Sequence, residues 1–240
     1  MKTARFEIRT DLALEEREGL TEQAKEVSGV SFRKWKGKTE DVQITEVKVL
    51  NEAGAETLGK PVGSYLTLEA DRLLLPDEDF HSEVSDELAN VLKELAEHAL
   101  GKKEGEEKKA PFLHGQPVIL VAGLGNQSVT PDSLGPRTVN NLSVSQNETG
   151  LKAIAPGVMA QTGMETARIL SGLIREIKPD LVIAIDALAA RSIRRLGTTI
   201  QLTDTGIHPG SGVGNHRHSL TKETLGIPVL AVGVPTVVGA

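Results

Sequence analysis

Cysteine is absent from the 240 residues, so the chain can form no disulfide, no zinc–thiolate site and no cysteine nucleophile. Any chemistry must therefore come from carboxylates, hydroxyls, histidines or lysines. Aromatic residues make up only 2% of the chain, which leaves valine, isoleucine, leucine and alanine to build the core.

Long apolar runs and an excess of positive charge are also missing. No run approaches the roughly 18 residues needed to cross a bilayer, and the start of the chain has no apolar stretch typical of a secretory signal. The chain has 33 acidic and 27 basic residues, which argues against a surface that binds nucleic acid through its phosphates. We therefore expect a soluble, cytosolic protein with no membrane partner and no direct nucleic-acid partner.

The composition, 39% apolar and 25% charged, is that of a globular protein. In the first half, alternating apolar residues predict strands over residues 42–50 and 64–69, with a turn at 51–54. Apolar residues at helical spacing predict a helix over 82–100, with acidic residues in its first turns. The charged stretch 101–110 is typical of a solvated loop.

The second half alternates unbroken apolar runs with helical patterns. Strands are predicted at 117–122, 181–185, 198–202 and 229–232, and helices at 134–144 and 164–177. Unbroken runs are typical of strands buried on both faces, and their alternation with helices predicts parallel β–α–β units. We expect an α/β fold: one three-layer αβα domain with a mostly parallel central sheet and a small β-hairpin elaboration from the N-terminal half.

The functional crevice of an open parallel sheet lies beyond the carboxyl ends of its strands. That rule selects five polar residues that follow predicted strands: Asn126, Asp132, Asp186, Asp204 and His208. A strand-end aspartate is often only a helix N-cap. Asp186, however, follows five apolar residues, where an ionised carboxylate costs desolvation energy unless a neighbour needs its charge. We therefore expect these side chains to meet at one edge of the sheet.

Two carboxylates in one site are typical of general acid–base hydrolysis. The pair holds one proton between them, so one member can activate a water while the other protonates a carbonyl or leaving group. The sequence has no P-loop and no H-E-x-x-H zinc helix, and its Gly123-Leu-Gly-Asn126 loop lacks the third glycine of a dinucleotide site. Asp204-Thr-Gly206 spells the tripeptide of pepsin-like proteases, but once only and in a parallel α/β context.

Seven longer motifs follow one another along the chain: residues 9–13, 123–126, 129–136, 155–159, 183–191, 204–215 and 233–238. In this order they closely resemble the germination protease family of endospore-forming bacteria. The resemblance implies an endopeptidase, made as a zymogen in the cytoplasm of the forespore, that degrades small acid-soluble spore proteins in the spore core during germination. It also implies a homotetramer, no cofactor, and Asp132 and Asp186 as the two catalytic aspartates.

The resemblance further implies a cleavage preference, which the chain itself carries. The family cuts after an acidic residue, before an apolar residue followed by alanine, and Thr10-Asp11-Leu12-Ala13 has that pattern. We therefore predict autoprocessing between Asp11 and Leu12, with residues 1–11 as a pro-segment and 12–240 as one α/β peptidase domain. An acidic residue before the cut needs a cationic partner, and four arginines near the two aspartates are candidates: Arg137, Arg191, Arg194 and Arg195, with Arg137 and Arg191 preferred.

The resemblance has departures and leaves alternatives. The chain ends at Ala240, where typical members have an aspartate at position 239 and continue, so we expect a short or truncated member that lacks the family's C-terminal segment. Gln127 stands where an aromatic residue is common, and the connection over 141–152 is shorter than usual.

The implied fold resembles the hydrogenase-maturation endopeptidases. In those relatives two carboxylates and a histidine hold a metal. A metal-dependent maturation-type endopeptidase that uses Asp132, Asp186 and His208 is therefore the first alternative, and a divalent metal is not excluded. The second is a non-enzymatic ligand-binding α/β domain or an inactive truncated core.

Overall fold

The computed structural model describes residues 10–22, 28–101, 116–144, 150–207 and 219–239. The strands in these residues are β1 (Val30–Lys36), β2 (Gln43–Val49), β3 (Gly63–Glu69), β4 (Ile119–Gly123), β5 (Leu151–Ile154), β6 (Leu181–Ala190), β7 (Thr199–Thr203) and β8 (Val229–Val238). The α-helices are α1 (Ala13–Glu22), α2 (Glu52–Leu58), α3 (Glu78–Ala99), α4 (Leu134–Asn140), α5 (Met159–Thr162), α6 (Thr166–Ile177) and α7 (Lys222–Leu225). Short 3-10 helices are η1 (Asp71–Leu74), η2 (Thr130–Asp132) and η3 (Ile193–Arg195).

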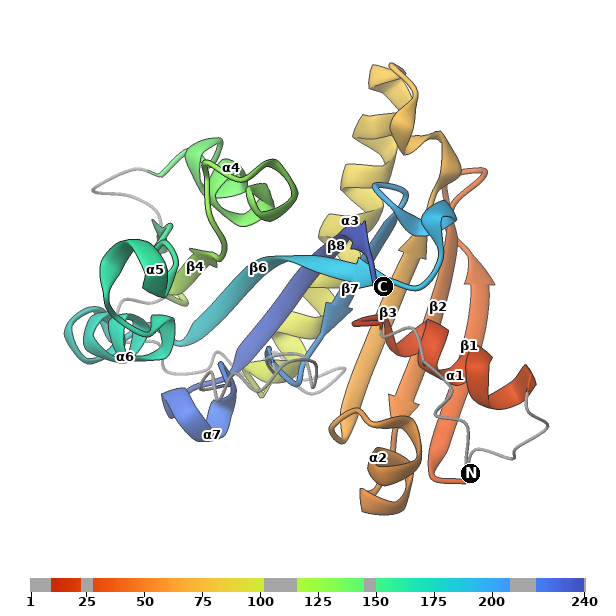
Figure 1. Ribbon diagram of the computed structural model, residues 1–240, viewed down its shortest axis with the longest axis horizontal. Helices are drawn as coiled ribbons and strands as arrows, with labels where there is room; N and C mark the ends of the chain where they lie inside the picture. Colours follow the sequence, from red (N-terminus) through yellow and green to blue (C-terminus); the bar gives the residue numbers. More distant parts are fainter. Residues whose placement is uncertain (1–9, 23–27, 102–115, 145–149, 208–218, 240) are drawn as a thin grey trace, which may run out of the picture.

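All of these strands join one mixed sheet with the order β1-β2-β3-β7-β8-β6-β4-β5 (Figure 1). Strands β8, β6, β4 and β5 are parallel, whereas β1, β2, β3, β7 and β8 pair antiparallel. The expected α/β class and its parallel region are thus confirmed. The antiparallel part is larger than a hairpin elaboration and continues the same sheet. Strand β7 runs opposite to β6 because only residues 191–198 join them, too few for a parallel crossover.

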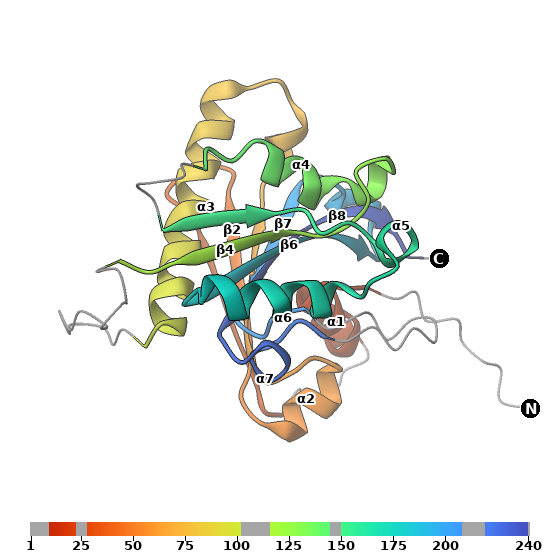
Figure 2. The ribbon, with the colours of Figure 1, turned by 90° about the vertical axis from the view of Figure 1, so that its left-hand side faces the viewer.

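Helices cover both faces of the sheet, which gives the three layers. Figure 2 shows α4 on one side of the parallel strands and α6 on the other. Helix α3 covers the same face of the sheet as α4 and packs on it through an apolar stripe that includes Phe80, Val84, Val91 and Leu95. Helices α6 and α7 cover the parallel strands on the opposite face, and α1 and α2 cover β2 and β3 there.

Most predicted elements are confirmed, with different ends. The helix expected over 82–100 begins at Glu78, because the Asp77 side chain caps it by accepting from the Phe80 N–H at 3.1 Å. The expected turn at 51–54 is wrong: Asn51 caps α2 and accepts from the Gly54 N–H at 3.0 Å. The helix expected over 134–144 ends at Asn140.

Strand β6 differs most from its prediction, because it runs to Ala190 and Asp186 lies inside it rather than at its end. Its partner on one side, β4, ends at Gly123 opposite Ile185, while β8 accompanies it to Ala190 on the other side. The second half of β6 therefore extends beyond β4. No helix among the described residues is long and apolar enough to span a bilayer.

Candidate active site

Asp132 lies in η2, in the loop that follows β4. The backbone N–H of Asn126 donates to its Oδ2 at 2.8 Å and to its carbonyl oxygen at 2.9 Å, which fixes the half-buried carboxylate against the loop. Gly125 makes this possible: its φ is 108°, and a Cβ there would lie 2.1 Å from the Asp132 carbonyl oxygen. The loop thus folds back on itself around Asp132.

The loop that carries Asp132 packs onto strands β6 and β8. Segment η2 contacts both β6 and β8, and the Thr236 hydroxyl of β8 donates to the Pro131 carbonyl at 2.6 Å. The Leu124 N–H donates to the Ile185 carbonyl at 2.8 Å, immediately before Asp186. The structure therefore brings the segment of Asp132 onto the strand that carries Asp186.

Asp186 is half-buried within β6, opposite Gly233 of β8. Its Oδ1 accepts from the Ala187 N–H at 2.9 Å. Asn126 also lies at this edge of the sheet. Its Oδ1 accepts from the Ser128 N–H and from the Gln161 Nε2, both at 2.9 Å, which links the loop to α5.

Asp204 does not join Asp132 and Asp186, contrary to the expectation that all these residues meet at one edge. Strand β7 runs antiparallel to β8, so its carboxyl end lies beside the amino ends of the parallel strands, away from Asp132 and Asp186. There Asp204 Oδ1 accepts from the Ser64 N–H at 2.8 Å, at the start of β3. The prediction failed because it treated β7 as a parallel strand. His208 lies outside the described residues.

The segment around the predicted cleavage site is bound at the C-terminal end of β6, with Thr10, Leu12 and Ala13 buried and Asp11 half-buried. The Asp11 N–H donates to the Ala189 carbonyl at 2.9 Å, and Asp11 Oδ2 accepts from the Ala189 N–H at 2.8 Å. Leu12 and Ala13 are 0% exposed. The Asp11 carbonyl accepts from Lys60 Nζ at 3.0 Å and from Gln201 Nε2 at 3.2 Å.

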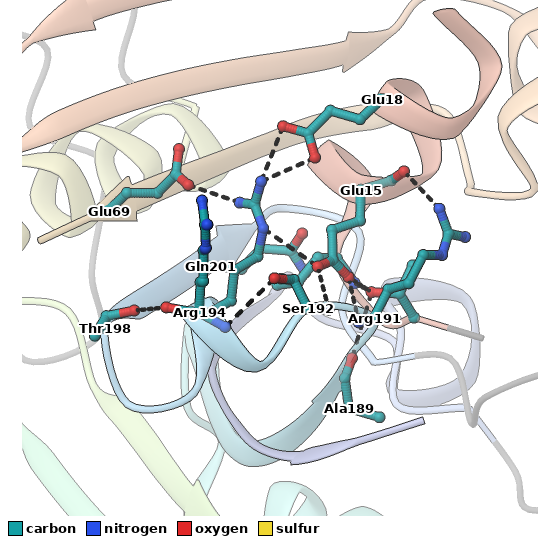
Figure 3. Close-up of polar contacts among 12 residues, drawn as sticks. Glu15, Glu18, Glu69, Ala189, Arg191, Ser192, Arg194, Thr198 and Gln201 are labelled. Atoms are coloured by element: carbon teal, nitrogen blue, oxygen red, sulfur yellow. Dashed lines mark hydrogen bonds and ion pairs between the residues drawn. The ribbon is translucent and has the colours of Figure 1, made fainter. Parts of the chain in front are cut away.

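A buried ion cluster holds α1 onto this end of the sheet (Figure 3). Glu15, whose side chain is 3% exposed, accepts from the Arg191 N–H at 2.6 Å and from the Ser192 N–H at 3.0 Å. Arg195 Nε lies 3.2 Å from Glu15 Oε1, and its two terminal nitrogens reach Glu18 at 2.9 Å and Glu69 at 2.8 Å. Burial raises the pKa of Glu69, and the charge of Arg195 opposes that shift.

The arginine candidates are thus placed in different surroundings. Arg191 donates to the Glu15 carbonyl at 3.1 Å and lies 3.5 Å from Glu16, while Arg137 on α4 and Arg194 in η3 are exposed. Lys60 was not singled out from the sequence, although it donates to Asp11. Burial lowers the pKa of Lys60, and Asp11 and Glu16 oppose this in that order.

Glu15 and Gln201 were also missed, and the sequence holds only a weak signal for each. Gln201 is a polar residue at a buried position of an apolar strand, where its amide needs partners. Glu15 lies in the first turn of a helix, which is an ordinary place for an acidic residue.

Two carboxylates on adjoining segments, one in the loop after β4 and one in the part of β6 that extends beyond β4, define a candidate hydrolase site on an α/β fold. Residues 7–240 match the model of the germination protease family, and the chain belongs to that family. It is 49% identical to a germination protease of Caldanaerobacter subterraneus over 97% of this chain and 70% of the relative. Identity is 44% with the Oceanobacillus iheyensis protein, over 98% of this chain and 65% of the relative. It is 43% with the Clostridium perfringens protein, over 98% and 71%.

The chain therefore spans about two thirds of the length of these relatives. Among solved structures, a [NiFe] hydrogenase maturation protease, HycI, from Thermococcus kodakarensis aligns with 50% of this chain and 75% of its own. The TM-score is 0.37 and the sequence identity 22%.

The placement of Asp204 predicts an unusual titration of Tyr65, the single tyrosine of the chain. Burial, together with the nearby Asp204 charge, raises the pKa of Tyr65 to about 12, while a hydrogen bond with Thr205 acts in the opposite direction. A titration of the phenol followed by absorbance should give its midpoint near that pKa in the folded chain and at about 10 in the unfolded chain. The raised folded pKa stabilises the fold below the unfolded value, and this contribution is lost as the pH rises through the folded one.

The Asp204→Asn variant should lower the folded midpoint, because it removes a negative charge beside the phenol. The exposed Asp41→Asn variant should leave it unchanged. Circular dichroism at each pH would verify that the chain is still folded. An Asp204→Asn midpoint equal to that of the unsubstituted chain would contradict this placement.

The Glu15–Arg195 pair predicts a large stability effect. The Arg195→Met variant leaves the buried Glu15 carboxylate without its cation, so the free energy of unfolding should fall by about 3–5 kcal/mol. Arg33, whose side chain is 72% exposed in its pair with Glu46, is the matched control, and Arg33→Met should cost less than about 1 kcal/mol. Urea unfolding measures both, and equal losses would contradict the assignment.

Proposed function

We propose that this protein is an endopeptidase that starts the degradation of small acid-soluble spore proteins in the spore core during germination. The observation that carries the proposal is membership of the germination protease family over residues 7–240. Relatives in several spore-forming genera have the same name, which supports a spore location. By the same reasoning, we expect the protein to act as a homotetramer without a cofactor.

In this proposal Asp132 and Asp186 share one proton and activate a water molecule. The ionised carboxylate takes a proton from the water as the oxygen attacks the peptide carbonyl, and the protonated one then supplies a proton to the leaving nitrogen. Support comes from the packing of η2 on β6 and β8, and from the Asn126 N–H that orients Asp132.

The proposal includes autoprocessing of a zymogen between Asp11 and Leu12. Cleavage there requires an acidic residue, then an apolar residue and an alanine, and the same preference would apply to the spore-protein substrates. The position of Asp11 supports the proposal, because it pairs with Ala189 on the strand that carries Asp186.

The test is hydrolysis of a peptide that contains Thr-Glu-Phe-Ala-Ser, with the products mapped by mass spectrometry. The unsubstituted chain should cut after the glutamate. The Asp132→Asn and Asp186→Asn variants should each lower the rate by about 10²- to 10⁴-fold, because each removes a proton-transfer group.

Asp204→Asn is the matched control, since Asp204 lies at the opposite edge, and it should retain the rate. Unchanged hydrolysis by either of the other two variants would refute the acidic pair. A chelator should leave the rate unaffected; loss of activity with chelator would instead favour the metal-dependent alternative with Asp132, Asp186 and His208.

A further inference from the structure

The segment Thr10–Ala13 lies in a site whose contacts suit a peptide. Gln201 uses both ends of its side-chain amide: Nε2 donates to the Asp11 carbonyl at 3.2 Å, and Oε1 accepts from the Ala13 N–H at 2.8 Å. A primary amide carries a C=O acceptor next to an NH₂ donor, just as a peptide group carries a C=O acceptor next to an N–H donor. Gln201 therefore binds this backbone much as a neighbouring strand would, and such contacts do not depend on the bound side chains.

Asp11 is bound both at its side chain and at its backbone carbonyl. Asp11 Oδ2 accepts from the Ala189 N–H at 2.8 Å, and Lys60 Nζ lies 3.0 Å from the Asp11 carbonyl oxygen. The Lys60 ammonium donates to the backbone carbonyl of Asp11, and the nearby negative charge of Asp11 opposes the effect of burial on the pKa of Lys60. An ammonium held at a half-buried position costs desolvation energy, and an acidic residue beside it returns part of that cost.

The next two residues enter closed surroundings. Leu12 and Ala13 are 0% exposed, and Ala13 packs against Val47, Val49 and Tyr65. An apolar side chain fits the first position and a small one the second. These contacts suit an acidic, an apolar and a small residue in that order.

The same site adjoins the candidate catalytic carboxylate. Asp186 and Gln201 are both paired with Gly233, from opposite sides of β8, so their side chains emerge on the same face of the sheet. Ala189, which binds Asp11, lies three positions after Asp186 on β6.

We propose that the site now occupied by Thr10–Ala13 is the substrate-recognition site of this protein, in which Gln201 binds the peptide backbone and Lys60 recognises the acidic residue before the cut. The inference rests on the proposed endopeptidase function. It assigns to Lys60 the role that the sequence suggested for Arg137 or Arg191, because Arg191 is engaged by α1 and Arg137 is exposed on α4. The N-terminal segment then competes with substrate for one site.

The experiment measures the affinity of the full chain for two labelled peptides, Thr-Glu-Phe-Ala-Ser and Thr-Gln-Phe-Ala-Ser, by fluorescence anisotropy. All proteins carry Asp186→Asn, which keeps the peptides intact and retains an oxygen for the Ala187 N–H. The glutamate peptide should bind about 10- to 100-fold more tightly than the glutamine peptide, as expected for a carboxylate that accepts from the Ala189 N–H and lies near the Lys60 ammonium. Lys60→Met should lower this ratio markedly, although the Ala189 N–H still donates to the carboxylate. Lys48→Met, a change at an exposed lysine on the other face, should preserve it.

The ratio compares two peptides on one protein, so a general loosening of the fold does not change it. A preserved ratio in Lys60→Met would overturn the role of Lys60. Hydrogen exchange locates the site independently of catalysis: the glutamate peptide should displace the segment and speed exchange at the Leu12 and Ala13 amides. Binding without that change would overturn the shared site. Failure of the peptidase function would appear separately, as absence of hydrolysis by the chain that retains Asp186.

Discussion

Strand β6 extends beyond its neighbour β4, and much of the candidate site follows from the need to satisfy its free edge. Strand β4 ends opposite Ile185, so the alternate N–H groups at residues 187, 189 and 191 need other acceptors. Acidic side chains supply them in sequence: Asp186, Asp11 and Glu15 accept at 2.9, 2.8 and 2.6 Å. One strand edge thereby positions a candidate catalytic carboxylate, the predicted cleavage site and the start of α1.

The cost of burying these carboxylates is offset by cations and by the sheet itself. Glu15 has Arg195 as well as two backbone N–H groups, and Arg195 also reaches Glu69 on β3. The cluster therefore joins α1 to strands of both the antiparallel and the parallel regions. A substrate that replaces Thr10–Ala13 must also replace the contacts of Asp11 with the Ala189 N–H and with Lys60. This requirement favours a peptide with an acidic residue at the position of Asp11.

The sequence was sufficient for the parallel strands and their helices, because unbroken apolar runs and helical periodicity are local signals. It also singled out Asp132 and Asp186 through the strand-end rule. It could not give the direction of β7, which depends on a short connection and on pairing with β3, so Asp204 was placed at the wrong edge. Lys60 and Gln201 were missed because their partners lie 49 and 190 positions away along the chain, and only the fold brings them to Asp11.

The most direct test is a crystal structure of the Asp186→Asn chain with the Thr-Glu-Phe-Ala-Ser peptide. The account predicts that the peptide lies along the free edge of β6, with its glutamate on the Ala189 N–H and beside Lys60, and with Thr10–Ala13 displaced. A peptide bound elsewhere, with Thr10–Ala13 still paired to Ala189 and Gln201, would contradict it.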